Sequence, residues 1–364
     1  MTRRPLARAA SRIFCRRSRS QTMTTNPPDL AARQVAERIR GGRNFLITSH
    51  RNPDGDALGS GLALQRLIRS MGKQARMQVR DGFFGALYNI PGADGVAVTD
   101  NLPSDYPGAY DALFTMECPE VERTGYPVLP GPVVNIDHHL GNTMYGEINY
   151  LDLEAPSVGE MVLQINRKHL HLPLDRETAI ALYVSLATDT GFFRYHNTTL
   201  RAFDAAEELV RAGVVPGDVS LWINESASRG SIKLLGLCLT TLDVTKDGKI
   251  ATIELPKRFF AEAEASPEDT EGIVNYGRMI DGVLVSALLK EIDGNSTRVS
   301  MRAKPGVDVQ AVAAMFGGGG HKAASGCTVP LPLAAAKLKL LVLLERAVNG
   351  VTVNGGKASG TVNR

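Results

Sequence analysis

The chain has 364 residues, of which 43% are hydrophobic and 22% are charged. This composition is typical of a soluble globular protein long enough for two domains. Its apolar runs are all shorter than the roughly 20 residues of a membrane span, so no membrane partner is expected. Residues 1–28 hold seven arginines and no acid, so the net charge of +3 leaves about −4 on the remainder. Affinity for nucleic acid must therefore be local.

The basic segment 1–28 admits three interpretations. It can be a transit peptide, an arm that binds nucleic acid, or untranslated or disordered sequence upstream of a true start at Met23. We expect the third, because residues 1–22 show no apolar periodicity and no helix cap. A chain that starts at Met23 should then keep its activity and melting temperature. The four cysteines are widely spaced, which favours a reduced, cytoplasmic protein.

Short apolar runs alternate with helical periodicity up to residue 212. Strands are predicted at 45–47, 76–79, 112–114 and 133–136, and helices at 58–71, 158–169 and 176–188. Strands that alternate with helices indicate a parallel sheet with helices on both faces, and ligands bind outside the carboxyl ends of such strands. We therefore expect an α/β catalytic domain at residues 29–212.

A looser, polar pattern at 213–232 predicts a connector to a second domain at 233–346. Segments 249–255, 283–292 and 297–302 are rich in β-branched residues and predict strands, whereas 309–315 predicts a helix. This combination indicates a smaller C-terminal α/β domain. The tail at 347–364 is rich in Gly, Ser, Thr and Asn and is expected to be disordered.

The first polar motif joins the strand at 45–47 to the helix that follows. It places His50, Asp54 and Asp56 on one turn, where their side chains can converge. Gly55 would let the backbone fold tightly around a cation. One aspartate could simply cap the helix, but capping does not account for a histidine and two aspartates together. We interpret the three residues as metal ligands.

Two further motifs end predicted elements. Asp137, His138 and His139 follow a strand, and the aspartate could orient a metal-bound imidazole, although adjacent histidines can also be surface residues. Asp189 ends an apolar helix, where the helix dipole disfavours an uncompensated carboxylate. A metal would supply the missing positive charge, and the alternative is an exposed aspartate in a turn.

These motifs resemble those of the DHH phosphoesterase family in their order and spacing. The matching segments are His50-x3-Asp54-x-Asp56, Asp137-His138-His139 and Asp189-Thr190-Gly191. The Gly-rich segment that ends at His321 resembles the signature of the family's DHH-associated C-terminal domain. The resemblance covers most of the chain. Its two-domain length is most similar to the bacterial nano-RNase/pAp phosphatase branch.

The resemblance implies two divalent cations, Mn²⁺ by preference or Mg²⁺. One ion would be held by His50, Asp54 and Glu117, and the other by Asp56, His138, Asp189 and the shared Glu117. Glu117 stands where the family has an aspartate. Its extra methylene still allows it to bridge two ions, but it could change their spacing and lower activity.

The resemblance also implies roles in catalysis and substrate binding. The catalytic motif would be Asp137, His138 and His139, with His139 on the phosphate. Backbone N–H groups of a Gly-rich segment can approach a phosphate closely, and an arginine suits a bidentate phosphate contact; a flexible turn is the alternative for the glycines. The implied substrate contacts are His139, Arg302, Gly318, Gly319, Gly320 and His321.

The expected activity is hydrolysis of phosphoester bonds in short oligoribonucleotides, together with 3′-phosphate removal from pAp. The expected partners are short single-stranded RNA or a nucleoside bisphosphate, and a second copy of the chain. One alternative is an inorganic pyrophosphatase or polyphosphatase, which the Gly-rich segment disfavours. Another is a catalytically silent nucleotide-binding module, which rests on Glu117 alone. The sequence leaves cleavage polarity and preferred length open.

Overall fold

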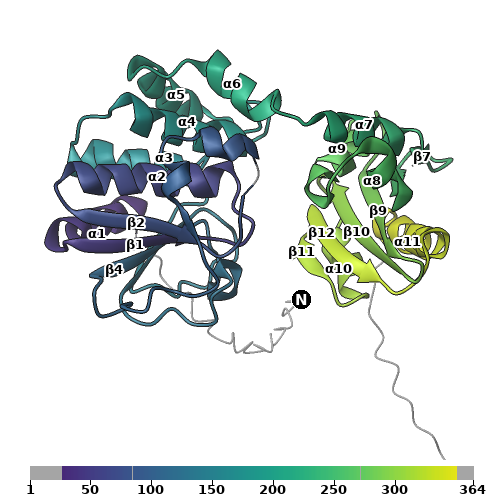
Figure 1. Ribbon diagram of the computed structural model, residues 1–364, viewed down its shortest axis with the longest axis horizontal. Helices are drawn as coiled ribbons and strands as arrows, with labels where there is room; N and C mark the ends of the chain where they lie inside the picture. Colours follow the sequence, from purple (N-terminus) through teal and green to yellow (C-terminus); the bar gives the residue numbers. More distant parts are fainter. Residues whose placement is uncertain (1–26, 84, 271, 351–364) are drawn as a thin grey trace, which may run out of the picture. The chain divides into compact units, whose positions relative to one another are not determined.

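The computed structural model describes residues 27–350 apart from 84 and 271. They form two compact units, divided between Ile223 and Asn224 (Figure 1). Each unit is built around its own six-stranded sheet. No helix among the described residues is long and apolar enough to cross a membrane. Disorder is predicted for residues 1–28 and 347–364, of which 1–26 and 351–364 lie outside the described residues. Within the described residues the prediction is wrong at residue 28, which begins a helix, and at residues 347 and 348, which end one.

Unit 1 contains a parallel sheet in the order β3-β2-β1-β4-β5-β6. Its strands are β1 (Asn44–Ser49), β2 (Gln74–Val79), β3 (Ala97–Val98), β4 (Ala112–Met116), β5 (Val133–Asp137) and β6 (Ile148–Leu151). Strands β1, β2 and β3 follow one another toward one edge of the sheet. The chain then crosses back to place β4 beside β1, and β5 and β6 follow toward the other edge. The strand order therefore reverses between β1 and β4, and in open α/β sheets ligands bind at the carboxyl ends beside such a reversal.

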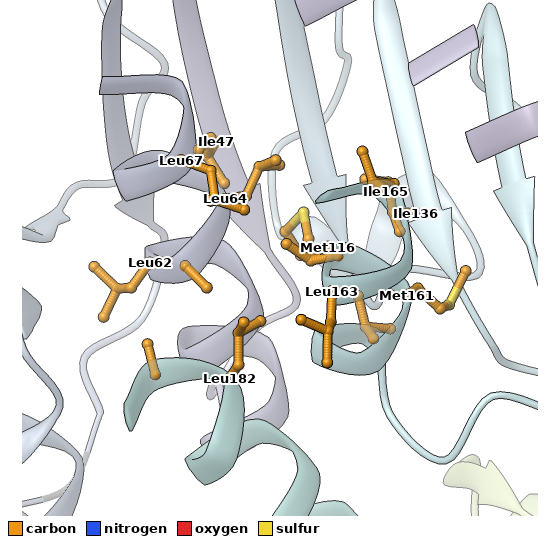
Figure 2. Close-up of a cluster of buried hydrophobic side chains, with 14 of the residues drawn as sticks. Ile47, Leu62, Leu64, Leu67, Met116, Ile136, Met161, Leu163, Ile165 and Leu182 are labelled. Atoms are coloured by element: carbon orange, nitrogen blue, oxygen red, sulfur yellow. The ribbon is translucent and has the colours of Figure 1, made fainter. Parts of the chain in front are cut away.

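The helices of unit 1 follow the alternation that the sequence predicts. They are α1 (Pro28–Gly41), α2 (Gly55–Ser70), α3 (Val158–Ile165) with its π-helical continuation η4 (Asn166–Leu170), α4 (Arg176–Asp189), α5 (Leu200–Arg211) and α6 (Pro216–Asn224); the 3-10 helices are η1 (Gly85–Asn89), η2 (Ala93–Gly95) and η3 (Val121–Thr124). Figure 2 shows Ile47 of β1 near Leu64 of α2, and Ile136 of β5 near Ile165 of α3, within one hydrophobic cluster. This apolar layer buries one face of the sheet.

The mixed α/β class is confirmed, but the second face of this sheet is covered differently from our expectation of helices. Leu46 and Leu113 on that face pack with Tyr110 and with the partly buried Leu102, Tyr106 and Leu129. These partners belong to the loops between β3 and β5. Gln78 of β2 donates a hydrogen bond through Nε2 to the hydroxyl of Tyr126 at 2.9 Å. Loops cover this face because they can satisfy its polar side chains, which an apolar helix face could not.

Close helix packing positions the start of α2. The helix begins at Gly55 because Oδ1 of Asp54 accepts hydrogen bonds from the N–H groups of Asp56 and Ala57, each at 3.0 Å. A Cβ on Gly55 would lie 2.5 Å from the hydroxyl oxygen of Thr188 on α4. Our expectation that Gly55 shapes a loop around a cation is therefore corrected: it is the first residue of a helix that packs tightly against α4.

Unit 2 contains a mixed sheet in the order β11-β12-β10-β9-β8-β7, in which β8 and β9 are parallel and the other neighbours antiparallel. Its strands are β7 (Asp243–Val244), β8 (Ile250–Leu255), β9 (Val285–Asp293), β10 (Ser296–Ala303), β11 (Gly319–His321) and β12 (Ala324–Val329). Its helices are α7 (Arg229–Leu239), α8 (Arg258–Ala263), η5 (Pro267–Thr270), α9 (Ile273–Arg278), α10 (Val309–Ala314) and α11 (Leu333–Val348).

Two hydrophobic clusters cover this second sheet. One cluster joins α10 and α11 to side chains such as Val299 and Met301 of β10. The other joins α7, α8 and α9 to Ile253 of β8 and Leu288 of β9, on the opposite face. The expected connector at 213–232 is largely helical in the structure, because α6 and the start of α7 occupy it.

Candidate metal centre

The six residues predicted as metal ligands converge at the carboxyl ends of three neighbouring strands. His50 follows β1, Glu117 follows β4 and His138 follows β5. The other three come from helix ends that reach the same place, with Asp54 and Asp56 at the start of α2 and Asp189 at the end of α4. Parallel strands end at the same edge of a sheet, so loops far apart in the sequence meet there.

The first group surrounds the imidazole of His50, which is 6% exposed. Its Nε2 lies 3.5 Å from Oε2 of Glu117 and 3.8 Å from Oδ1 of Asp54. Its Nδ1 lies 2.9 Å from the carbonyl oxygen of Arg51. If Nδ1 donates a hydrogen bond to that carbonyl, Nε2 faces two carboxylates, a position that favours either a proton or a metal cation.

The second group surrounds His138 in the same way. Its Nε2 lies 3.8 Å from Oδ2 of Asp56, 3.9 Å from Oε1 of Glu117 and 3.9 Å from Oδ2 of Asp189. Its Nδ1 lies 3.0 Å from the carbonyl oxygen of Ala155. The three carboxylate oxygens are too far from the nitrogen for a direct hydrogen bond. They are placed instead around a common centre.

Glu117 belongs to both groups and is the most constrained residue of the site. Its φ of +60° lies in the left-handed region, which costs a non-glycine residue roughly 1–2 kcal/mol. Its side chain is 5% exposed, and its buried Oε2 has no hydrogen-bond partner. A buried carboxylate oxygen without a donor is strongly unfavourable unless a cation neutralises it. The backbone strain and the unpartnered oxygen both indicate a ligand position.

The N-terminus of helix α3 holds the carboxylate of Asp56 in position. Its Oδ2 accepts a hydrogen bond from the N–H of Val158 at 2.9 Å, and its Oδ1 accepts one from the N–H of Gly159 at 3.2 Å. These are the first N–H groups of α3, where the helix dipole favours an anion. No sequence motif indicated this support, because it depends on the packing of α2 against α3.

The carboxylates of the cluster shift the protonation of its histidines. Burial alone lowers the pKa of His50, but hydrogen bonding and charge from Asp54 and Glu117 outweigh it and raise the pKa to about 10. Burial likewise lowers the pKa of His138, while Glu117 and the charges of Asp56 and Asp189 raise it to about 11. The site therefore attracts positive charge at the Nε2 atoms of both rings.

The same crowding disfavours ionisation of two of the acids. Burial, followed by the charges of Glu117 and Asp189, raises the pKa of Asp56. Burial also raises the pKa of Asp189 to about 7, with Glu117 adding to the shift and His138 opposing it. Burial opposes ionisation of Glu117 as well, but its two histidine neighbours lower its pKa. A carboxylate cluster of this kind is most stable when bound cations neutralise it.

The donor atoms fit a pair of divalent cations. Within each group the ligand atoms all lie within 4.8 Å of one another, and the groups are His50, Asp54 and Glu117, and Asp56, Glu117, His138 and Asp189. Carboxylates and imidazoles with no thiolate suit Mn²⁺ or Mg²⁺. A third combination of Glu117, His138 and His139 also meets this distance, so the geometry admits His139 as a ligand as well as a phosphate contact.

A buried polar network orients His139. The fully buried Asp137 places Oδ1 2.8 Å from Nδ1 of this ring. The amide of Asn142 donates through Nδ2 to Oδ2 of Asp137 at 2.5 Å and to Oδ1 of Asn135 at 2.7 Å. Sequence analysis did not identify Asn142. The one indication in the sequence is that Asn142 lies three residues after His139. Asparagine is so common in loops that this position alone would not identify it as a site residue.

Asn197 provides similar support to Asp189. Its Nδ2 donates a hydrogen bond to Oδ2 of Asp189 at 3.0 Å. The amide of Asn197 and the ring of His138 lie beside this helix-terminal carboxylate, and compensation of its charge by a metal stays a prediction. Asn197 lies on a loop eight residues later, and no motif in the sequence pointed to it.

Of the residues predicted to contact substrate, two positions lie on one row of the unit 2 sheet. Arg302 of β10 is half-buried and pairs with Ala324 of β12, which in turn pairs with position 321 of β11. Gly319 and Gly320 belong to β11, so the glycine run is partly a strand and not an open loop. A Cβ on Gly318 would lie 2.2 Å from the carbonyl oxygen of Gly326. Close backbone packing therefore requires glycine at position 318.

Comparison with known proteins places this geometry in a family. Residues 44–186 match the DHH family, N-terminal domain, and residues 247–349 match the DHHA1 domain. The chain is 32% identical over 300 residues to the bifunctional oligoribonuclease and PAP phosphatase NrnA of Thermus thermophilus, covering 82% of this chain and 88% of that protein. It is 30% identical over 299 residues to the probable bifunctional oligoribonuclease and PAP phosphatase NrnA of Streptococcus mutans, covering 81% and 93%.

A solved structure agrees with these matches. The crystal structure of an exopolyphosphatase-related protein from Bacteroides fragilis superposes with a TM-score of 0.80 at 26% identity, covering 89% of this chain and 96% of that one. The family expected from the motifs is thereby confirmed. The chain belongs to the DHH phosphoesterase family and carries a DHH domain followed by a DHHA1 domain.

Proposed function

We propose that this protein is a two-metal phosphoesterase that hydrolyses short oligoribonucleotides and removes the 3′-phosphate from pAp. The single observation that carries the proposal is the position of Glu117, whose two carboxylate oxygens face separate groups of ligand atoms. His50 and Asp54 complete one group. A shared carboxylate of this kind is typical of two-metal hydrolytic sites.

The chain's own residues would have separate roles in metal binding and substrate binding. Bound divalent cations would supply positive charge against the attacked phosphate and would activate the attacking water. His139, oriented by Asp137, would contact the phosphate and limit its rotation. Arg302 and the backbone N–H groups of the segment from Gly318 to Gly320 would bind a second phosphate or the sugar-phosphate backbone. Each of these roles depends on position more than on proton transfer.

The substrate class rests on the relatives. The proteins from Thermus thermophilus and Streptococcus mutans carry the names oligoribonuclease and PAP phosphatase, and each matches both domains of this chain at 30% identity or more. The DHHA1 domain, with its glycine run, further supports a nucleotide substrate over pyrophosphate. We also propose Mn²⁺ as the preferred ion, because the ligand set combines imidazole nitrogens with carboxylate oxygens.

Two further proposals concern the state of the protein. We propose a cytoplasmic protein, which the three free and buried cysteines among the described residues support. We propose a homodimer as well, supported by an exposed apolar stripe on α5, where Leu200 is 82%, Phe203 53% and Val210 43% exposed. A self-complementary helix face suits a two-fold interface. Sedimentation of the Phe203→Glu variant, expected to be monomeric, tests this.

Product analysis tests the proposed activity. The purified chain is stripped of metal and loaded with Mn²⁺ or Mg²⁺, and metal content per chain is measured by mass spectrometry. Diribonucleotide, pAp and pyrophosphate are then offered separately. We expect about two ions per chain, metal-dependent release of mononucleotides and of phosphate from pAp, and faster turnover with Mn²⁺. Hydrolysis of pyrophosphate alone, or binding of nucleotide without turnover in the loaded protein, would contradict the proposal.

A further inference from the structure

Unit 2 carries a cavity that neither the metal centre nor the glycine run includes. It has a volume of about 710 Å³ and lies between α8 and the ends of β9 and β10. Phe260 of α8 and Ile292 of β9 line it with apolar surface. Its charged lining residues are Lys257, Lys290, Arg298 and Glu291. The cavity therefore combines an aromatic ring with three cations and one carboxylate.

The cations of the cavity are not neutralised by direct ion pairs. Within the described part of the chain, no carboxylate lies within 4.0 Å of the charged atoms of Lys257, Lys290 or Arg298. The carboxylate of Glu291 instead accepts a hydrogen bond from the backbone N–H of Lys257 at 2.8 Å. Electrostatic complementarity favours an anionic ligand here.

Two exposed acids limit the strength of that attraction. Glu268 and Asp293 are both solvent-exposed and interact with the charges of Lys290 and Lys257 respectively. An anion that also stacks an aromatic or apolar group on Phe260 would bind better than a simple inorganic anion. A nucleotide has both properties, and an arginine such as Arg298 can contact its phosphate with two donors.

The cavity continues the face of the sheet that carries Arg302. Arg298, Ser300 and Arg302 alternate along β10 and share one face. Their partners on β12 are Thr328, Gly326 and Ala324. Helices α7, α8 and α9 cover this face over β8 and β9, whereas α10 and α11 cover the other face. Helix α9 also contacts β10, and the strip between the two arginines is lined by the small, partly exposed residues Ser300 and Gly326.

The length of this strip exceeds one nucleotide. Arg302 lies four residues after Arg298 along the strand, which corresponds to about 13 Å. The small residues between them, Ser300 and Gly326, leave space for a sugar-phosphate backbone to lie along the sheet. A mononucleotide bound at Arg302 could not reach the cavity, but the later residues of an oligonucleotide could.

We propose that this cavity binds a distal nucleotide of an oligonucleotide whose reacting end is held near Arg302. The site would favour oligonucleotides over pAp, because pAp is too short to occupy both positions. This inference rests on the proposed function and adds to it a subsite that selects for length. Phe260 would stack on a base, and Arg298 and Lys290 would contact phosphates.

Binding measurements on the full-length protein test the subsite. A fluorescent RNA pentamer and fluorescent pAp are titrated in EDTA, so that the readout does not depend on metal or turnover. We expect Arg298→Ala and Phe260→Ala each to weaken pentamer binding about tenfold while leaving pAp binding unchanged. Arg302→Ala should weaken the binding of both ligands. The matched control is Arg346→Ala, an exposed arginine on α11 at the opposite face, which should change neither.

The outcomes separate this inference from the proposed function. Equal weakening of pentamer and pAp by Arg298→Ala, or no weakening of either, would overturn the subsite even if the wild-type enzyme hydrolyses both substrates. A wild type that hydrolyses neither would instead overturn the proposed function. Melting curves of each variant establish that it is folded, and Arg298→Lys, which keeps the charge, should recover part of the pentamer affinity.

Discussion

The ionisable side chains of the two units lie in different environments. At the strand ends of unit 1, Asp56 and Glu117 are buried beside two histidines, and their charges shift one another's pKa. On the open face of unit 2, Arg298 is exposed and Arg302 is half-buried, and neither arginine belongs to a buried cluster of ionisable groups. In a buried cluster each charge changes the pKa of the others, whereas exposed charged groups act nearly independently. Substitutions should therefore have collective effects in unit 1 and local effects in unit 2.

The largest effect is expected for Glu117. Replacing it by glutamine removes the negative charge shared by both groups, so the chain should lose most bound metal and at least a hundredfold in turnover. Glu117→Asp restores the family residue and should retain metal with equal or higher activity. Metal content per chain and diribonucleotide hydrolysis are measured together. A fully active Glu117→Gln enzyme would remove this residue from the centre and weaken the contrast between the two units.

Metal removal should destabilise unit 1 and leave unit 2 unchanged. A ligand present at a hundred times its dissociation constant stabilises the folded state by about 2.7 kcal/mol, which for a domain of this size raises the melting temperature by roughly 5–10 °C. Calorimetry of the full chain with and without EDTA should show one transition that moves and one that does not. Equal shifts of both transitions would show that the units do not respond separately.

The change in melting temperature on metal removal should depend on pH because of His50 and His138. The folded pKa values of His50 and His138, about 10 and about 11, lie above the unfolded value of 6.5. Their protonation therefore stabilises the metal-free fold fully below about pH 6.5, and this contribution is lost as the pH rises toward 10. Metal competes with the same protons. The difference in melting temperature between loaded and metal-free protein should grow from pH 6 to pH 9, and a constant difference would contradict this coupling.

A smaller and more selective effect is expected for Arg302→Ala. Loss of a charged phosphate contact typically costs about 1.5–3 kcal/mol, which is tenfold or more in substrate affinity. Metal content should stay at the wild-type value, because Arg302 belongs to unit 2 and none of the ligand groups includes it. Arg302→Lys keeps the charge without the bidentate geometry and should be intermediate. Metal loss in either variant would contradict the separation of roles.

The smallest effect is expected at the opposite end of the parallel sheet. Oδ2 of Asp111 accepts hydrogen bonds from the N–H groups of Arg43 and Asn44 at 2.6 and 2.9 Å, and these bonds lower its pKa. Because the group is exposed, Asp111→Asn should cost less than about 1 kcal/mol at pH 7. The wild-type advantage is present above the unfolded pKa and is lost as the pH falls through the lower folded pKa. Urea unfolding at pH 7 and pH 2.5 measures it, and an advantage that persists in acid would exclude this origin.

Local motifs in the sequence were sufficient to predict the α/β class and five of the six residues that converge, whereas Glu117 was selected through the resemblance to the DHH family. Short apolar strands followed by His50, Glu117 and His138 place polar groups at strand ends, and parallel strands end on one edge. Spacing was informative here because each motif is local, and local patterns survive without knowledge of packing.

The tertiary structure decided what holds these residues in place. Asn142 and Asn197 support the site from loops, and the N–H groups of Val158 and Gly159 support Asp56 from a different helix. Such contacts join residues far apart in the chain or use residue types too common to be noticed. They arise only after packing has fixed the distance between elements, and that distance has no local signature in the sequence.

The same distinction holds for the faces of the two sheets. Periodicity determined that Leu46 and Leu113 would be buried, but not that loops instead of helices would cover them. In unit 2, alternation along β10 determined that Arg298 and Arg302 share a face, whereas the position of α8 beside Arg298 created the cavity. A strand's own residues fix which side chains share a face, because its period is two. What covers that face depends on how distant elements pack, because burial is non-directional and many partners can satisfy it.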